Sequence, residues 1–297
     1  LKTTPGVYAT KKGGAFGDSE LRMRGFKSEN VAVLINGVPM NDMEWGGLYW
    51  SNWAGLSDVT RSTQTQRGLG ASKVSAPSVG GSINIVTKGA DAEKGGTVSY
   101  AMGNNGYNKM LFSVSTGMSK SGWALTLLGA KTWGDGYVQS TDFEAYNWFV
   151  NLTKRFNENH QLSLTAFGAP QWHNQRNNAN GLTISGWQQV KQYVEDPEDI
   201  YQYNPSFGYR KNGVAYNQNQ NKYNKPQISL NHQWQIDHKS SLSTVAYVSI
   251  GRGYGTSGQA NTELGASRSD WYAANKGILS TKFRNADGTF AYDQMEE

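Results

Sequence analysis

Four aromatic rings lie close together in the segment NDMEWGGLYWSNWAG, residues 41–55. They belong to Trp45, Tyr49, Trp50 and Trp53. Their spacing fits neither a helical stripe nor the alternation of a strand, and a pair of glycines interrupts it. Flat rings in such a loop either pack onto the protein or stack on a ligand, with little loss of rotamer freedom. The segment is therefore a candidate binding surface for a sugar face or an aromatic chelate.

Other residue patterns argue against catalysis. The chain has no cysteine, and its histidines lack the spacing of metal ligands: His160, His173, His232 and His238. A G-x-G-x-x-G phrase begins at Gly253, but no helical pattern follows it, so a dinucleotide site is not expected. QRGLGASK lacks the spacing of a phosphate-binding loop, and no nucleophile elbow is present. We expect no enzyme activity, no cofactor and no metal.

Composition narrows the class of protein. Glycine supplies 35 of the 297 residues, well above the usual share of about 7%. The net charge of +5 is spread along the chain without a basic block, so nucleic acid is not an expected partner. The longest apolar run, residues 31–35, is far shorter than the roughly 18 residues of a spanning helix. A barrel strand shows lipid only every second residue, so a membrane remains compatible with this sequence.

From about residue 94 the sequence alternates apolar and polar side chains in segments of roughly ten residues, as barrel strands do. In one segment Ile228 and Leu230 face one way, while Ser229 and Asn231 face the other. A soluble sandwich alternates in the same way. The expected strands cover 96–103, 107–117, 123–133, 145–156, 161–169, 223–236 and 241–251.

The connections between these strands are sorted by length. Short turns, MSKSG, NENH and DHKS, alternate with long loops near 133–145, 170–222 and 252–297; only the first loop, around NNG, is short. The loop 170–222 carries an expected short helix at 186–194, and its tyrosines and amides suit either ligand contact or solvent. Short turns at one end and long loops at the other are typical of outer-membrane barrels.

Two tryptophans support the barrel interpretation. Trp123 and Trp133 lie ten residues apart on the same side of one expected strand. With ~3.3 Å per residue and ~45° of tilt they span roughly 24 Å, close to the ~25 Å apolar band between two aromatic girdles. This register also turns Lys131 outward, where a lysine near the interface can snorkel. The opposite register stays open as an alternative.

Five phrases in the first ninety residues resemble the plug of a TonB-dependent outer-membrane receptor. In the order and at the spacing of that family they are PGVY at 5–8, LRMRGF at 21–26, NVAVLINGVP at 30–39, QRGLGAS at 66–72 and GGSINIVTK at 80–88. Their style is similar to that of receptors of the Bacteroidetes group. Asn36 departs from the family, which usually has aspartate in its "DGVP" phrase, but the glycines that set the turns are kept.

The resemblance implies an all-β-dominated chain in two parts. Residues 1–89 would be the plug domain without its N-terminal part. Residues 90–297 would begin a 22-stranded transmembrane antiparallel β-barrel with about seven strands and the long loops outside the cell. Seven strands leave two unpaired edges, which hydrocarbon does not tolerate. We therefore expect an internal piece of a longer receptor.

The resemblance also assigns roles to residues. The loops at the tip of a plug, here around 10–19, 27–30 and 41–55, meet the incoming ligand. The expected ligand-binding residues are Trp45, Tyr49, Trp50, Glu44, Lys27 and Glu29. Trp53 is expected to pack, and the alternative is that the other rings also pack against the barrel wall.

Arg24 and Arg67 stand in the two "RG" phrases. They resemble the plug half of a plug–barrel ion-pair lock, because a buried guanidinium needs carboxylate partners. The glutamates would come from strands beyond residue 297. The alternative is a pair of ordinary surface arginines.

The function that this resemblance implies is active import of a scarce nutrient across the outer membrane of a Gram-negative bacterium. The implied partners are TonB with ExbB and ExbD, outer-membrane lipids, and a nutrient ligand such as a glycan, a peptide or a metal chelate. A surface lipoprotein lid is a further partner that the Bacteroidetes style allows. The alternative function is an all-β carbohydrate-binding, lectin-like or adhesin module without transport.

Overall fold

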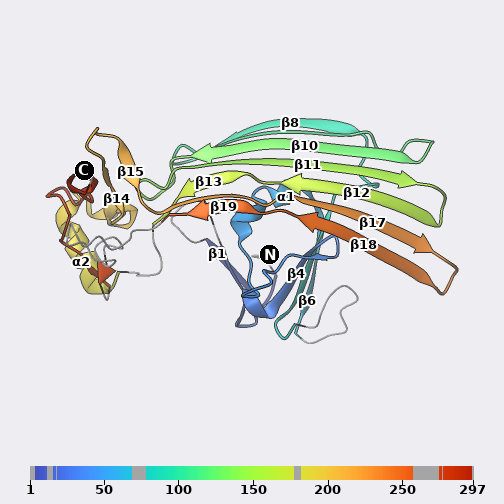
Figure 1. Cartoon of the computed structure of the whole chain (residues 1–297), viewed down its shortest axis with the longest axis horizontal. Helices are drawn as coiled ribbons and strands as arrows, with labels where there is room; N and C mark the ends of the chain where they lie inside the picture. Colours follow the sequence, from blue (N-terminus) through green and yellow to red (C-terminus); the bar gives the residue numbers. More distant parts are fainter. Residues whose placement is uncertain are drawn as a thin grey trace.

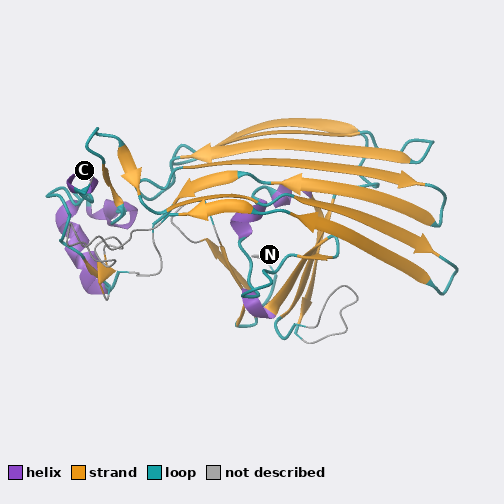
Figure 2. Cartoon of the chain, viewed as in Figure 1, coloured by secondary structure: helices purple, strands orange, loops and turns teal. Residues whose placement is uncertain are grey.

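The structure is a computed structural model. It describes residues 4–11, 16–17, 19–68, 78–176, 182–256, 274–275 and 277–295. A long curved sheet, called the wall below, lies over a smaller inner domain that begins at the N-terminus (Figures 1 and 2). No helix in these ranges is long and apolar enough to cross a membrane.

The wall contains ten antiparallel strands. They are β8 (Gly95–Met102), β9 (Asn108–Ser115), β10 (Trp123–Gly134), β11 (Phe143–Arg155), β12 (His160–Gly168), β13 (Gln171–Asn174), β16 (Gln220–Asn224), β17 (Gln227–Gln235), β18 (Ser241–Ser249) and β19 (Arg252–Gly255). β11 pairs with β13 near its start and with β12 further along. The next strands continue this arrangement: β16 pairs with β13 and β19, and β17 pairs with β12 and β18. β12 with β13, β16 with β17, and β18 with β19 each form one long strand with a short break. Together with β8, β9, β10 and β11 they make seven long strands, which confirms the seven predicted segments.

Two of the interruptions fall at prolines. Pro170 separates β12 from β13, and Pro226 separates β16 from β17. Proline has no N–H for the ladder, so it is tolerated where a strand pauses. The third interruption, at Ile250 and Gly251, lies beside them between β18 and β19.

The two faces of the wall differ in chemistry. On β11 the side chains of Phe149, Asn151 and Thr153 are buried under the inner domain, whereas Trp148 and Leu152 on the opposite face are exposed. This alternation is the period of two that a β-strand imposes. The inner face is thus lined by polar and aromatic groups that face the inner domain, and the outer face exposes mainly apolar side chains.

The predicted outward register of β10 is confirmed. Trp123 and Trp133 lie opposite Lys154 and Glu144 of β11, on the outer face. Lys131 lies on that face too, 2.8 Å from a Glu144 carboxylate oxygen and over the ring of Trp133. The lysine is therefore accommodated by an ion pair and a ring at the edge of the apolar band.

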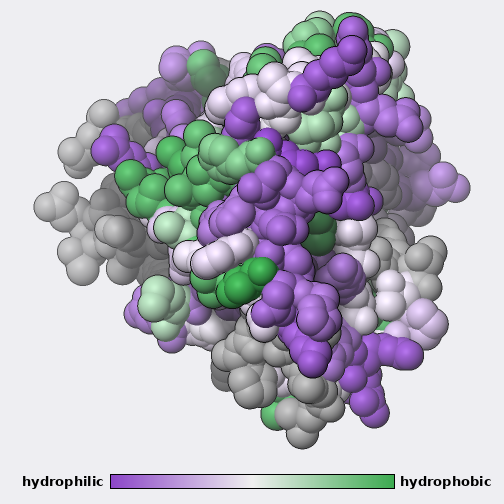
Figure 3. All heavy atoms as spheres, turned by 90° about the vertical axis from the view of Figure 1, so that its right-hand side faces the viewer, coloured by the Kyte–Doolittle hydropathy of each residue, from purple (hydrophilic) through white to green (hydrophobic). Residues whose placement is uncertain are grey.

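The short turns lie together at one end of the wall, on the right of Figure 1. Seen from that end, the molecule presents mainly hydrophilic residues (Figure 3). The long loops lie at the opposite end. Their elements are α2 (Ile184–Val190), the 3-10 helices η3 (Lys191–Tyr193) and η4 (Pro197–Gln202), β14 (Phe207–Tyr209), β15 (Ala215–Asn217), β20 (Ala274–Asn275), β21 (Ile278–Leu279) and η5 (Tyr292–Gln294). The helix predicted at 186–194 is confirmed as α2 and η3, two residues earlier.

These loop elements pack on a small core of their own. Val190, Ile200, Tyr203 and Leu279 form it. The guanidinium of Arg284 donates to the hydroxyl of Tyr203 at 2.9 Å and to the carbonyl of Gly288 at 2.9 Å. Burial raises the pKa of Tyr203 to about 12. Two loops that are about eighty residues apart in the sequence are thereby joined into one body.

The inner domain consists of two sheets. The first contains β1 (Val7–Lys11), β2 (Ser19–Met23) and β3 (Phe26–Lys27). The second has the order β5 (Val38–Pro39), β4 (Val31–Ile35), β7 (Gly81–Thr87) and β6 (Thr60–Arg67), with β4 and β7 parallel. The helical pieces are η1 (Ser28–Asn30), η2 (Trp50–Trp53) and α1 (Leu56–Val59).

The turn between β4 and β5 explains the unusual Asn36. Asn36 and Gly37 both have positive φ, 52° and 83°, as an Asn-Gly hairpin turn requires. The Asn36 side chain also donates to the hydroxyl of Thr87 at 2.8 Å and accepts from the Thr87 N–H at 2.9 Å. An amide supplies both a donor and an acceptor at this position, which a carboxylate cannot do.

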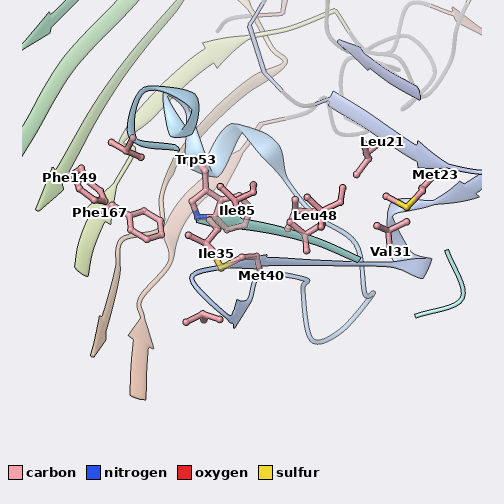
Figure 4. Packing of buried hydrophobic residues seen from close by; sticks show 14 of the residues in the cluster. Leu21, Met23, Val31, Ile35, Met40, Leu48, Trp53, Ile85, Phe149 and Phe167 are labelled. Carbon is pink, nitrogen blue, oxygen red and sulfur yellow. The ribbon is translucent and has the colours of Figure 1, made fainter. Parts of the chain in front are cut away.

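One hydrophobic core joins the inner domain to the wall (Figure 4). Val33, Ile83 and Trp53 of the inner domain belong to the same buried cluster as Phe149 and Phe167 of the wall. Burial of these side chains in one cluster stabilises the contact between the inner domain and the inner face of the wall.

Truncating a side chain at the centre of this core tests how much the core contributes to the stability of the inner domain. Ile83→Ala removes a fully buried side chain and should destabilise the inner domain by about 2–5 kcal/mol. The rate of limited proteolysis within residues 1–90 of the full-length receptor should therefore rise. Ile184→Ala, at an isoleucine that is 81% exposed, serves as the control and should leave the rate unchanged. Equal rates in both variants would contradict the assignment of this core.

Candidate functional site

The aromatic segment forms a compact turn on the side of the inner domain that faces the long loops, below β13 and β19 in Figure 1. The Asp42 carboxylate accepts the N–H groups of Glu44 and Trp45, at 2.9 and 3.1 Å. Backbone bonds between Asp42 and Gly46 and between Asp42 and Gly47 close the turn. The two N–H groups that donate to the carboxylate hold the pKa of Asp42 below its ordinary value, and the bond from Trp45 is the largest cause.

Asn41 fastens this turn to the neighbouring strand. Its amide donates to the carbonyls of Val31 and Gly46, at 2.9 and 2.8 Å, and its carbonyl accepts the N–H of Val33 at 2.8 Å. A partly buried side chain with all these partners fixes the loop before a ligand binds, so little entropy is lost on binding. The turn is therefore preorganised.

The four rings divide into two pairs. Trp45 and Tyr49 are 40% and 49% exposed, and their ring centroids lie 5.2 Å apart. Trp50 is half-buried and packs against the core, and Trp53 is 5% exposed. Trp53 packs as predicted. Trp45 and Tyr49 present most of the ring surface that a ligand could reach.

The predicted charged residues lie around the same turn. Glu44 belongs to it, and the backbone of Glu29 adjoins Gly46, where an added Cβ would lie 3.5 Å from the Glu29 carbonyl oxygen. Glu44, Glu29 and Lys27 are exposed. The structure thus brings the backbone of Glu29 close to the turn that carries Glu44 and Trp45, and places Lys27 at the end of β3.

Arg24 and Arg67 lie near each other across the first residues of the inner domain. The Arg67 guanidinium donates to the carbonyl of Pro5 at 3.3 Å, and a Cβ added to Gly68 would lie 2.8 Å from Arg24 Nη1. Both arginines are exposed, and within the described ranges neither forms an ion pair. Their role in a plug–barrel lock stays a prediction.

A different ion pair joins the inner domain to the wall. Lys109 of β9 donates to both carboxylate oxygens of Asp58 in α1, at 2.7 and 2.8 Å. The two side chains are only 22% and 14% exposed. Sequence reasoning missed this pair, because nothing local links residues 51 positions apart.

Two further interactions between the inner domain and the wall were missed. Phe16 stacks on Phe143 of the wall, with centroids 4.8 Å apart and planes 9° apart, and meets the buried His173 edge-on. Lys225, at the interruption before Pro226, acts electrostatically on Asp42 and helps to lower its pKa.

Among the residues that the structure describes, no three histidine, aspartate or glutamate side chains are grouped to hold a metal. The site therefore offers rings, carboxylates and ammonium groups from two loops of the inner domain and from the wall. These groups can bind and orient an organic ligand.

Both parts of the chain are similar to known proteins. Residues 1–96 match the family described as "TonB-dependent Receptor Plug Domain". The inner domain is thus similar to the plug domains of TonB-dependent receptors. The plug and the wall together resemble the unliganded ferric citrate transporter FecA, with a TM-score of 0.62 at 16% identity over 86% of this chain and 37% of that one. This likeness confirms the predicted fold of plug followed by barrel strands.

Curated relatives are transporters and receptors. The chain is 25% identical over 165 residues to the vitamin B12 transporter BtuB of Vibrio vulnificus, covering 53% of this chain and 27% of that protein. It is 23% identical over 274 residues to the ferric enterobactin receptor of Pseudomonas aeruginosa, covering 83% of this chain and 35% of the relative. The chain thus spans about a third of such proteins, and it belongs in the outer membrane of a Gram-negative bacterium. The Bacteroidetes style stays a prediction, since these relatives come from other groups.

The depressed pKa of Asp42 predicts a pH dependence of the turn. A carboxyl whose pKa is lower in the folded state stabilises that state above its unfolded pKa, and this contribution is lost as the pH falls through the folded value. We expect the turn to keep its order at pH 6 and to lose it progressively below about pH 4. Hydrogen exchange of residues 41–49, corrected for intrinsic rates, should show less protection at pH 3. The Asp42→Asn variant should lack this change; equal pH sensitivity of both proteins would contradict the role of the carboxylate.

The Asp58–Lys109 pair predicts a non-additive mutational effect. Lys109→Met leaves a partly buried carboxylate without its partner, at an expected cost of about 1–3 kcal/mol. The double variant Lys109→Met with Asp58→Asn removes both charges and should recover part of the loss. Release of the plug to protease in the full-length receptor is the measurement. Additive effects of the two substitutions would show that the pair is not coupled.

Proposed function

We propose that this chain is part of a TonB-dependent transporter that imports a scarce nutrient across the outer membrane. The observation that carries the proposal is the exposed Trp45–Tyr49 pair on a preorganised turn of the plug. The plug lies against the wall, and the turn faces the loop end of that wall.

The chemistry around the rings favours a ligand with a flat face and polar edges. Trp45 and Tyr49 offer stacking surface, and Glu44, Glu29 and Lys27 offer charges of both signs within the neighbouring loops. Trp50 would support the turn from its half-buried position. The relatives are named for vitamin B12, ferric enterobactin and ferric citrate. A metal chelate, a glycan and a peptide are the ligand classes to test.

Gating by movement of the plug is compatible with the interface that holds it. A cavity of about 570 Å³ separates plug and wall and is lined largely by polar residues, among them Asn36, Lys88, Asn151 and Asn231. Within it the Asn231 amide donates to the Asn36 carbonyl at 3.1 Å. Water can replace such hydrogen bonds when the plug shifts, so this polar part of the interface can open without exposing apolar surface. TonB with ExbB and ExbD would supply the force from the periplasm.

The rings provide the test of ligand binding. Trp45→Ala and Tyr49→Ala should each weaken uptake of the cognate nutrient about 10-fold or more, because a stacked ring contributes on the order of 1–3 kcal/mol. Phe156→Ala removes a 62% exposed ring at the opposite, short-turn end and should leave uptake unchanged. Uptake by the native host carrying each variant of the full-length receptor is the measurement. Unchanged uptake in both ring variants would exclude these rings as ligand contacts.

A second experiment separates transport from binding alone. Deleting TonB in the host should abolish uptake while surface binding of the nutrient persists. Binding and accumulation that are both insensitive to TonB would favour a lectin-like or adhesin module instead. Comparing receptor abundance in iron-starved and iron-replete cells assigns the ligand class, since induction by starvation identifies an iron chelate.

A further inference from the structure

The outer face of the wall carries a band of rings and charges at its loop end. In one row across five strands, directly paired residues are Trp133, Glu144, Trp172, Lys222 and Tyr254. One step nearer the short turns, Lys131 pairs with Tyr146, and Asn224 pairs with Arg252. All of these positions lie on the face turned away from the plug.

This band lies at the border of an apolar zone. Below it, towards the short turns, the same face exposes Trp148, Leu164, Ile228, Leu230 and Val248. Such a zone is the part of a barrel wall that contacts hydrocarbon, and aromatic girdles mark its edges. The rows with Trp133 and Tyr146 therefore lie at the level of the outer-leaflet headgroups.

A groove is hollowed into this band where strands β11, β13, β16 and β19 meet. Its volume is about 550 Å³, and its walls include the rings of Tyr146, Trp172 and Tyr254. Lys222 and Arg252 line it from neighbouring strands. All the strands that form it belong to this chain.

The charges in the band around the groove do not cancel. Lys131 is paired with Glu144 at 2.8 Å, whereas within the described part of the chain Lys222 and Arg252 have no ion-pair partner. Three positive groups less one negative group leave two positive charges. At the headgroup level cations are tolerated, and they attract the negative charge of lipid headgroups.

The register brings the two cations to one point. Arg252 pairs with Asn224, two residues from Lys222 on the same strand, so the two are diagonal neighbours about 7–8 Å apart at the backbone. Long side chains can reach a common ligand across that distance. A phosphate group suits them, because arginine binds phosphate with two parallel hydrogen bonds and lysine acts as a point charge.

We propose that this groove is a binding site for a phosphorylated lipid of the outer leaflet. The phosphate lies between Lys222 and Arg252, and the rings of Tyr146, Trp172 and Tyr254 pack against the apolar and sugar portions of the lipid. The lipid supplies the missing negative charge at the headgroup level. The site lies on the opposite face of the wall from the nutrient turn and does not depend on the proposed transport.

Native mass spectrometry of the full-length receptor in detergent tests the site. The probes are bisphosphorylated lipid A and its fully dephosphorylated form. We expect retention of the phosphorylated lipid at least about tenfold above the dephosphorylated one, since a charge-assisted hydrogen bond is worth more than one tenfold step. The variant Lys222→Gln with Arg252→Gln should lose this preference. Arg252→Lys, which keeps the charge, should retain part of it.

Lys154→Gln is the matched control. Lys154 lies on the same outer face, over the ring of Trp123 at the short-turn end, and its loss should leave lipid retention unchanged. Heat-modified mobility in gels checks that each variant is a folded barrel. Equal retention of both lipids, or undiminished retention by the folded double variant, would overturn the proposal. Displacement of the lipid by millimolar inorganic phosphate would also overturn it, because the groove would then be a site for free anions.

Discussion

The structure depends on one constraint, the strict alternation of side chains along strands that separate two environments. In β11 the residues Phe149, Asn151 and Thr153 are buried towards the plug, and the residues between them face outward. A shift of one residue in any strand would move the polar amides to the outer, hydrocarbon-facing side and the apolar rings to the inner face. The position of the plug, the girdles and the groove on the outer face all follow from this single register.

The plug is held to the wall by two kinds of contact that answer to different demands. Near Trp53, Phe149 and Phe167 the contact is apolar and close-packed (Figure 4). Elsewhere it is sparse and polar, as between Asn36 and Asn231 and within the cavity around them. Apolar packing gives the seat its stability, and hydrated contacts leave the rest of the surface free to slide. The partly buried Asp58–Lys109 ion pair is intermediate between these two kinds of contact, because it is charged but largely shielded from water.

The sequence was informative where a pattern repeats and uninformative where partners meet only in the folded chain. The wall strands were predictable because a period of two persists over eight to thirteen residues in β8 to β11. The burial of Trp53 followed from its closeness to the next element. By contrast, the stacking of Phe16 on Phe143 and the Asp58–Lys109 pair join residues far apart in the sequence. No local propensity encodes such pairs, because they arise from the seating of one domain in another.

The interruptions at Pro170 and Pro226 and beside Gly251 lie side by side in neighbouring strands, so they form a seam across the wall. On one side of the seam, β12, β17 and β18 carry the hydrocarbon-facing residues. On the other side, the short β13, β16 and β19 continue into the loop body that Arg284 and Tyr203 hold together. The seam separates the part of each strand that faces hydrocarbon from the part that leads to the loops. The part on the loop side can accumulate substitutions and insertions, and so change its specificity in evolution, while the part that faces hydrocarbon keeps its register.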